Sequence, residues 1–493
     1  MFECWLVAGR HGNRGRPVET AATVAAGCDG DWVGNRCSGR CAGFRGGHSS
    51  FMICVRWLAV CGGLAVSSAA PAAPGEEFAG VVAGFSQLEW LAGAGLNEEP
   101  LDNNDWLPEF EGAAAVEVEL SNPHFAAADA LGRVFIADKA SHSILRIDPD
   151  GRVFTHAGLH VAGTGQLPAA PATTQALDSP NGLFVKPDGT VFIYDTGNHR
   201  IRRVAPDGTM TTVVNDASRT YSAIGRGLWV SPDEKTVIYT DGTVVKQSRN
   251  GVITTLATGF EELGNIDVHP LTGQLYVTDR ASTDTTKSAV WRLEVDGTRT
   301  RVAGNGEVSG GGDGWPATET YLDQVRGIAF TPSGGYYLCT HKGGDVWYVD
   351  LDGIIHLFLQ GRGSGNRNDG NGQSPPVTGF DVLSEPRSVS LAPNGDVLIA
   401  TNDTGYIRRV RHAEAPRQPA PEWLTVAVPR QGSHHLRWTA ISGSVYLVER
   451  SVNPAQNDWT VVAVTVPDSG VGEWSGPAVP AAENLFYRIA PPR

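Results

Sequence analysis

Cysteine is scarce in most of this chain. Six of the seven cysteines precede residue 62, and only Cys339 lies beyond it. Paired disulfides therefore do not stabilise the folded part. Basic residues are also few. The chain has 39 Lys and Arg and 53 Asp and Glu, which gives a net charge of −14. A nucleic-acid-binding domain needs a basic face, so we expect no nucleic-acid partner.

Common enzyme motifs are missing as well. The sequence has no GxSxG nucleophile turn, no HExxH helix and no phosphate-binding glycine loop outside its own repeated turns. What it does have is glycine and proline, 60 and 30 residues, which separate short β-rich runs. That pattern indicates an all-β sandwich, barrel or propeller. A hydrophobic content of 41% and 493 residues predict a globular protein of two or more domains.

The N-terminal part is typical of an exported protein. Residues 52–73 contain a start-competent Met52, a basic Arg56, an apolar run and a cluster of small residues. This layout predicts a secretory signal peptide, too short to serve as a membrane span. We expect export to the periplasm, the extracellular space or the cell surface, with no membrane span after signal removal. Residues 1–51 are predicted to be an unstructured extension or a mis-assigned start; the alternative is a cysteine-rich metal knuckle.

An internal repeat is the most informative feature. Residues 179–214 contain three strands and the start of a fourth, joined by Pro-Asp-Gly turns. Five further copies follow the same order: 122–156, 225–257, 264–303, 325–359 and 386–411. One four-stranded unit cannot bury both of its faces, so the copies must stack around an axis.

These strings resemble the NHL repeat, with its Pro-x-Gly start, "LYVAD"-like strand and "RIRR"-like strand. The resemblance covers residues 85–411 and implies a six-bladed β-propeller of the TolB-like and gluconolactonase-like kind. The last copy lacks an outer strand. The segment SQLEWLAGAG (residues 86–95) is predicted to supply that strand and close the ring; the alternative is a disordered linker.

Four connections are long and glycine-rich: 94–120, 158–178, 304–322 and 360–383. Such loops either bind a ligand or pack over the blade edges. Asp313 and Asp369 lie in glycine-rich runs, but the D-x-D-x-D-G spacing of a calcium loop is absent. Calcium is thus unsupported, and we expect no cofactor.

The C-terminal part has a second β pattern. A proline-rich linker spans residues 412–422, and alternating apolar residues follow over 423–493. This segment resembles a truncated fibronectin type III module, which implies a small β-sandwich. Its aromatic residues are predicted to form the core: Trp438, Tyr446, Trp459 and Tyr487.

Aligning the repeats predicts which residues face the axial channel. The starts of the six innermost strands are His124, Asn181, Arg226, Gly264, Arg326 and Arg387. The ends of the second strands, on the same rim, are Asp138, Asp195, Asp241, Asp279, Thr340 and Thr401. Arg226 is expected to pair with Asp241, whereas Arg326 and Arg387 face threonines.

Converging guanidinium groups are costly to bury unless an anion compensates them. We therefore hypothesise an anion-binding channel mouth that holds a carboxylate, phosphate or uronate, with His341 on its rim. The alternative is that Arg326 and Arg387 pair with nearby acids: Asp323, Glu385 or Asp403.

The sequence also resembles two enzyme families that have related propellers. The segment GLWVSPDEKTVIYTD resembles the gluconolactonases, which implies a divalent metal held by Glu, two Asn and Asp. Asn181 matches one ligand, but Arg226 and Gly264 replace two others. The resemblance to peptide-amidating lyases implies a histidine-bound zinc, yet only His124 and His341 are available, so no metal and no catalytic residue is predicted.

The leading hypothesis is an exported, monomeric binding or scaffold protein. Its partner is an unidentified protein, glycan or anionic small molecule. The second hypothesis is a lactonase-like hydrolase or lyase acting on a sugar lactone or anionic small molecule.

Overall fold

A computed structural model describes most of the chain. The described residues are 75–95, 103–218, 226–294, 296–361, 369–401, 405–413, 423–427 (backbone only), 434–441, 444–452, 459–467, 469–476 and 485–490. The predicted signal peptide, the extension before it and most of the predicted linker lie outside these residues.

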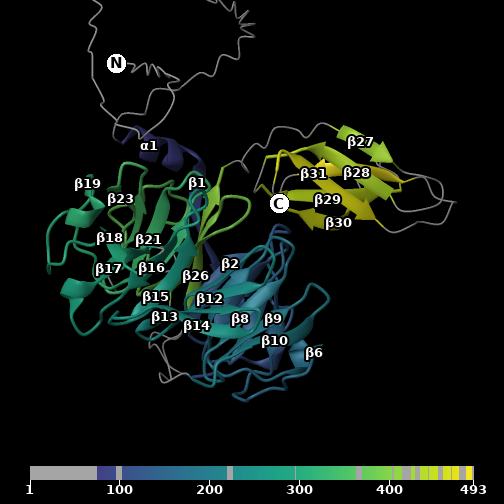
Figure 1. Cartoon of the computed structure of the whole chain (residues 1–493), viewed down its shortest axis with the longest axis horizontal. Helices are drawn as coiled ribbons and strands as arrows, with labels where there is room; N and C mark the ends of the chain where they lie inside the picture. Colours follow the sequence, from purple (N-terminus) through teal and green to yellow (C-terminus); the bar gives the residue numbers. More distant parts are fainter. Residues whose placement is uncertain are drawn as a thin grey trace, which may run out of the picture. The chain divides into compact units, whose positions relative to one another are not determined.

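Between Phe85 and His412 the structure contains antiparallel sheets of four or five strands (Figure 1). The first comprises β2 (Pro123–Ala128), β3 (Val134–Asp138), β4 (Ser143–Ile147) and β5 (Val153–Gly158). The second comprises β6 (Ala170–Pro171), β7 (Pro180–Val185), β8 (Val191–Asp195), β9 (Arg200–Val204) and β10 (Thr209–Asn215). The third comprises β11 (Leu228–Val230), β12 (Thr236–Asp241), β13 (Val244–Arg249) and β14 (Val252–Ala257).

The remaining three sheets continue the series. The fourth comprises β15 (Leu263–Val268), β16 (Leu275–Asp279), β17 (Ala289–Leu293) and β18 (Arg299–Ala303). The fifth comprises β19 (Trp315–Pro316), β20 (Val325–Phe330), β21 (Tyr336–Thr340), β22 (Val346–Val349) and β23 (Ile354–Leu359). The sixth comprises β1 (Phe85–Ala92), β24 (Pro386–Leu391), β25 (Val397–Thr401) and β26 (Tyr406–His412). The prediction of an all-β propeller is confirmed. Each sheet contains the strands of one copy of the repeat, and β1, β6 and β19 are added from outside the copies.

Hydrogen bonds join each sheet to the next around the ring. The Tyr194 hydroxyl donates to the Thr240 carbonyl at 2.9 Å, and the Thr278 hydroxyl donates to the Arg326 carbonyl at 2.7 Å. The Ser390 hydroxyl of the sixth sheet donates to the Ala126 carbonyl of the first at 2.6 Å. Further bonds of this kind are Ala130 to Pro187, Thr240 to Gly264 and Cys339 to Pro386.

The N-terminal strand completes the sixth sheet, as the sequence predicted. β1 pairs antiparallel with β26, from Phe85 opposite His412 to Ala92 opposite Ile407. Leu88 of β1 is fully buried in the hydrophobic core between the fifth and sixth sheets. The ring is therefore closed by two segments more than 300 residues apart, which removes an open sheet edge.

A short helix precedes this strand. In α1 (Glu76–Ala83), Glu77 accepts a hydrogen bond from the Tyr348 hydroxyl at 2.9 Å. Phe78 stacks on His356 with ring centroids 4.5 Å apart. The helix thus docks on the fifth sheet. Among the described residues, no helix is long and apolar enough to cross a membrane.

The four long connections lie along the outer edges of the sheets. Gly112 donates to Val153 of β5, Trp315 of β19 pairs with Ile355 of β23, and Gly372 donates to Leu88 of β1. On the second sheet, β6 pairs with β10. Small side chains at these contacts are buried: Ala115, Ala172 and Ala317. These contacts agree with packing over the blade edges, the second of the two interpretations.

The C-terminal part has two three-stranded sheets. One comprises β27 (Trp423–Ala427), β28 (His434–Thr439) and β31 (Val471–Gly476), and the other β29 (Tyr446–Ser451), β30 (Thr460–Thr465) and β32 (Phe486–Ala490). Trp438 and Tyr446 are buried in one hydrophobic cluster that draws on both sheets, and Tyr487 packs against it. The two sheets therefore face one another as a small sandwich. Trp459 instead lies under the guanidinium group of Arg488.

Candidate functional site

Four of the six predicted inner-ring residues occupy β-bulges at the start of the innermost strands, whereas Arg226 lies two residues before β11. The ladder between β20 and β21 passes from Val325 opposite Thr340 to Gly327 opposite Cys339, so Arg326 is left unpaired in register. The same shift leaves out His124, Asn181 and Arg387 in their own sheets. A bulge redirects a side chain out of the regular alternation. The repeat alignment therefore identified structurally equivalent positions; their ligand-binding role stays a prediction.

Gly264 stands where the other sheets carry a side chain, because two inner strands approach closely there. A Cβ atom at Gly264 would lie 2.5 Å from the Arg326 carbonyl oxygen. The fourth sheet bulges over two residues, and Asn265 is the buried polar side chain at this point. Neither side-chain polar atom of Asn265 has a hydrogen-bond partner.

Glu262 is the carboxylate of the fourth sheet at this rim. Its Oε2 lies 3.1 Å from Nη2 of Arg280, and its Oε1 lies 4.0 Å from Nη2 of Arg326. The Ser282 hydroxyl also donates to it. Arg326 is 1% exposed, yet its Nε and Nη1 have no hydrogen-bond partner. The prediction that Arg326 faces only a threonine is wrong, because a carboxylate absent from the sequence interpretation lies nearby.

Glu385 is the corresponding carboxylate between the fifth and sixth sheets, and it also contacts cationic side chains. Its Oε2 lies 3.3 Å from Nη2 of Arg387 and 3.3 Å from Nε2 of His341, and its Oε1 contacts Lys342. The alternative prediction for Arg387 is thus confirmed for Glu385, while Asp403 lies outside the described residues. Burial lowers the pKa of His341 to about 2, and the charge of Arg280 acts in the same direction. His341 is therefore neutral.

Arg226 interacts electrostatically with members of both groups. Its side chain is buried, and its Nε and Nη1 have no hydrogen-bond partner. Burial lowers the pKa of Arg226 to about 9, with the charge of Arg387 as the next cause, while Glu262 opposes the shift. Burial, followed by the charges of Arg387, Lys139 and Arg226, also lowers the pKa of His124 well below its usual range. The residues that share these contacts form what we call the mouth cluster: His124, Arg226, Glu262, Arg280, Arg326, His341, Lys342, Glu385 and Arg387.

Asn181 has no described side-chain contact with this cluster. It is buried, and its Oδ1 has no hydrogen-bond partner.

The expected pairing of Arg226 with Asp241 is wrong. Oδ2 of Asp241 lies 2.7 Å from Nζ of Lys246, which also lies 2.8 Å from Oδ2 of Asp216. Two of the aspartates that end the second strands, Asp195 and Asp279, hold the connections that enter the inner strands. Asp279 accepts hydrogen bonds from the backbone of Glu261 and Glu262 at 3.0 and 2.8 Å. These two carboxylates are structural.

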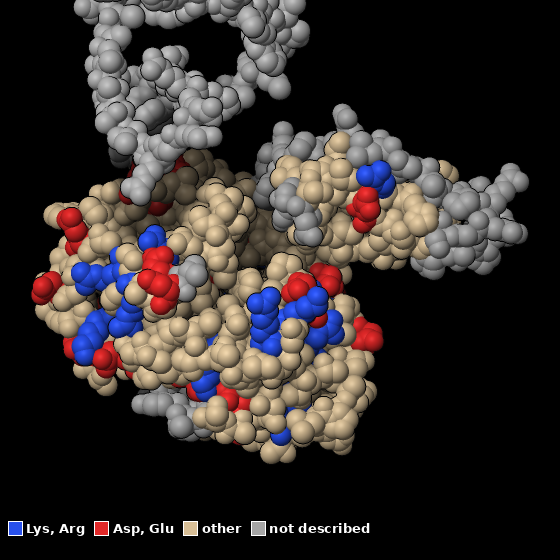
Figure 2. All heavy atoms as spheres, in the orientation of Figure 1, with Lys and Arg blue, Asp and Glu red and all other residues tan. Residues whose placement is uncertain are grey.

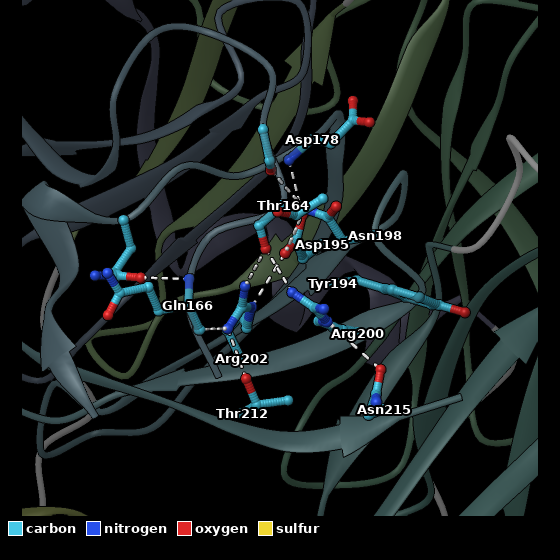
Figure 3. Close-up of polar contacts among 12 residues, drawn as sticks. Thr164, Gln166, Asp178, Tyr194, Asp195, Asn198, Arg200, Arg202, Thr212 and Asn215 are labelled. Atoms are coloured by element: carbon cyan, nitrogen blue, oxygen red, sulfur yellow. Dashed lines mark hydrogen bonds and ion pairs between the residues drawn. The ribbon is translucent and has the colours of Figure 1, made fainter. Parts of the chain in front are cut away.

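Asp195 shows this structural role most fully (Figure 3). Its carboxylate accepts a hydrogen bond from the backbone of Asp178 at 2.8 Å and from Nε of the buried Arg202 at 3.1 Å. The Arg202 guanidinium continues to the carbonyls of Thr164 and Gln166 at 2.9 and 2.8 Å. One buried ion pair therefore fixes the long connection before β7 to the second sheet.

Three members of the mouth cluster were missed by the sequence interpretation: Glu262, Arg280 and Lys342. The repeat contained a usable signal for the first two. Glu262 and Glu385 each stand two residues before the aligned inner position, and Arg280 and His341 each directly follow the end of a second strand. The prediction used only the start of each innermost strand and the end of each second strand, so it did not include these neighbouring positions.

The described residues contain no group of three or more His, Cys, Asp or Glu side chains placed to hold a metal ion. At the mouth, cationic side chains outnumber the carboxylates Glu262 and Glu385. Chemically, this arrangement suits an anion better than a metal cation.

Comparisons with known proteins show the fold and no family. No family model matches the sequence, and no curated protein matches it. A protein of unknown function from Bacteroides thetaiotaomicron is similar in structure, with a TM-score of 0.51, 14% identity, and coverage of 66% of this chain and 75% of that chain. An auxiliary nutrient binding protein from the same species has a TM-score of 0.47 and 14% identity, covering 65% of this chain and 75% of that chain. A gluconolactonase from Xanthomonas campestris has a TM-score of 0.41 and 14% identity, covering 59% and 86%. At these identities the likeness is one of propeller fold.

Proposed function

We propose that this protein is a non-catalytic binding protein whose propeller holds a small anionic ligand at the mouth cluster. The observation that carries the proposal is the state of Arg226. It is 5% exposed and has no ion pair with any described carboxylate, and two of its nitrogens have no hydrogen-bond partner. A buried guanidinium group in that state is costly unless a further anion compensates it.

Arg326 supports the same proposal. Nη2 of Arg326 lies 4.0 Å from Oε1 of Glu262. The other oxygen of that carboxylate, Oε2, lies 3.1 Å from Nη2 of Arg280. Glu262 is thus shared between two arginines and cannot neutralise Arg226 as well. A carboxylate or phosphate held between Arg226 and Arg326 would accept the free N–H groups in charge-assisted hydrogen bonds.

Isothermal titration of the purified full-length chain with D-glucuronate and with inorganic phosphate tests this function. We expect saturable binding of at least one anion, and a Kd more than about tenfold weaker in Arg226→Gln and in Arg326→Gln, because each loses a charged hydrogen bond. Arg301→Gln, an exposed arginine on β18, is the matched control and should bind as the wild type does. Thermal unfolding of each variant shows whether it is folded.

The absence of binding by either anion, or equal affinity in folded Arg226→Gln, would overturn the proposal. Hydrolysis of a sugar lactone that depends on an added divalent metal would instead favour the lactonase-like hypothesis.

We also propose that the protein is exported, on the basis of residues 52–73, and that the C-terminal sandwich is a fibronectin type III-like adaptor. Both parts of the proposal rest on the sequence. Cell fractionation, with N-terminal sequencing of the exported form, tests the first, since cleavage should fall close to residue 73.

A further inference from the structure

The outer edges of the propeller sheets are unequal, and this inequality is independent of the mouth cluster. Chain segments add backbone hydrogen bonds to the outer strands of four sheets. Gly112 and Ala113 bind β5, β6 pairs with β10, β19 pairs with β23, and Gly372 and Gln373 bind β1. Within the described residues, no backbone hydrogen bond joins the outer edge of β14 or of β18 to another segment.

These two edges, which no other described segment pairs with, differ in charge. β18 contains Arg299 and Arg301, both exposed, and charged side chains on an edge discourage strand pairing. β14 reads VITTLA and has no charged residue. It is rich in β-branched side chains, and its Val252 is 64% exposed. An uncharged, exposed edge of this composition favours pairing with another strand.

From these edges we propose that β14 is a dimerisation edge, which pairs antiparallel with β14 of a second copy of this chain. The partner is a second copy because the edge has no charge to repel its own image. β18 would repel its own image through two arginines. A twofold axis makes such a contact self-complementary and closed. This proposal differs from the monomer expected from the sequence.

The register of the dimer follows from the hairpin that forms the edge. Arg249 pairs with Val252 across a two-residue turn in which Asn250 and Gly251 have φ of 50° and 80°, as in a type I′ turn. In that ladder, Val252 and Thr254 direct their backbone groups toward β13. The backbone groups of Ile253 and Thr255 therefore point outward. Bonding between Ile253 of one copy and Thr255 of the other places Thr254 opposite itself on the twofold axis.

Sedimentation velocity of the full-length chain over a range of concentrations tests the dimer. We expect a concentration-dependent dimer whose dissociation constant rises at least about tenfold in Thr254→Lys, since like charges would then be directly opposed. Thr300→Lys, on the exposed β18, is the matched control and should leave the dimer unchanged. A wild type that stays monomeric at all concentrations, or a Thr254→Lys variant that dimerises equally well, would overturn the inference.

Thr254→Cys tests the register directly. Residues opposed at a non-hydrogen-bonded antiparallel position lie close enough for a disulfide. Mild oxidation should yield a covalent dimer, and mass spectrometry should find the peptide containing residue 254 linked to itself. Thr300→Cys should not do so. A link from residue 254 to one of the six N-terminal cysteines would show instead that this chain's own N-terminal segment covers the edge.

Discussion

Replacing Arg202 by methionine should be among the most destabilising single changes in the propeller. The side chain is 1% exposed, and its guanidinium donates to Asp195, Thr212 and two loop carbonyls at 2.6–3.1 Å. Methionine keeps most of the aliphatic volume but removes every donor. Breaking a buried ion pair by deleting one partner costs about 3–5 kcal/mol. We expect the lower end, about 3 kcal/mol, because Asp195 keeps hydrogen bonds from Asp178 and Asn198.

The neighbouring Arg203 provides the control. It lies on the same strand with its side chain 28% exposed, and its Nε is 2.7 Å from Oε2 of Glu234. A pair this accessible contributes about 0.2–1 kcal/mol. Urea unfolding should therefore separate Arg203→Met from Arg202→Met by about 2 kcal/mol at pH 7. Limited proteolysis should also cut the connection at residues 158–178 faster in Arg202→Met, because Thr164 and Gln166 lose their anchor.

The pH dependence of this loss follows from Asp195. Burial raises its pKa to about 6 even with Arg202 beside it, and removing the arginine would raise it further. At pH 5 the carboxyl group of the variant would be protonated, so the unpaired charge would disappear and the loss should shrink. Equal stability of the two arginine variants at pH 7, or a loss that grows toward pH 5, would refute this account of the buried pair.

Two further changes test the ring closure and a buried carboxyl group. Leu88→Ala should cost about 3 kcal/mol, because Leu88 is fully buried where β1 closes the ring; Leu271→Ala, at a 71% exposed site, should stay within about 0.5 kcal/mol in the same denaturation assay. Burial raises the pKa of Asp267 to about 6, above its value in the unfolded chain. Its contribution to stability is therefore full below about pH 4 and is lost as the pH rises through 6. The stability of the wild type relative to Asp267→Asn should increase from pH 7 to pH 4.5, and a constant difference would contradict this assignment.

Most of the fold could be predicted because the repeat fixes both turn and strand positions. The Pro-Asp-Gly turns mark where β7 gives way to β8 and β9 to β10. The inner ladders of the first, second, fifth and sixth sheets share the same register shift. The closing strand was predictable because the last copy lacked an outer strand. The edge pairing of the long connections was not decided by their sequence, because it uses backbone groups that any residue type carries.

The site was less predictable because an aligned position fixes a location and leaves the partner open. One column of the third strands shows this plainly. Arg202, Lys246 and Arg408 are aligned in the second, third and sixth sheets. Arg408 donates to the Val382 and Asp369 carbonyls, whereas Lys246 binds two carboxylates. In the first, fourth and fifth sheets the same column holds Leu145, Trp291 and Trp347.

In the inner ring, too, the aligned position of a residue did not reveal its partner. Asp241 was expected to neutralise Arg226 because the two share a sheet, but Lys246 of the neighbouring strand lies closer and takes the carboxylate. Asp195 and Asp279 are likewise engaged by neighbouring backbone groups. The arginines of the mouth share Glu262 and Glu385, and Arg226 has neither within ion-pair distance. The chain's net negative charge does not relieve this, because charge stabilises a buried guanidinium group only where it lies close to it. This local deficit of negative charge at the axis is why an anionic ligand is proposed there.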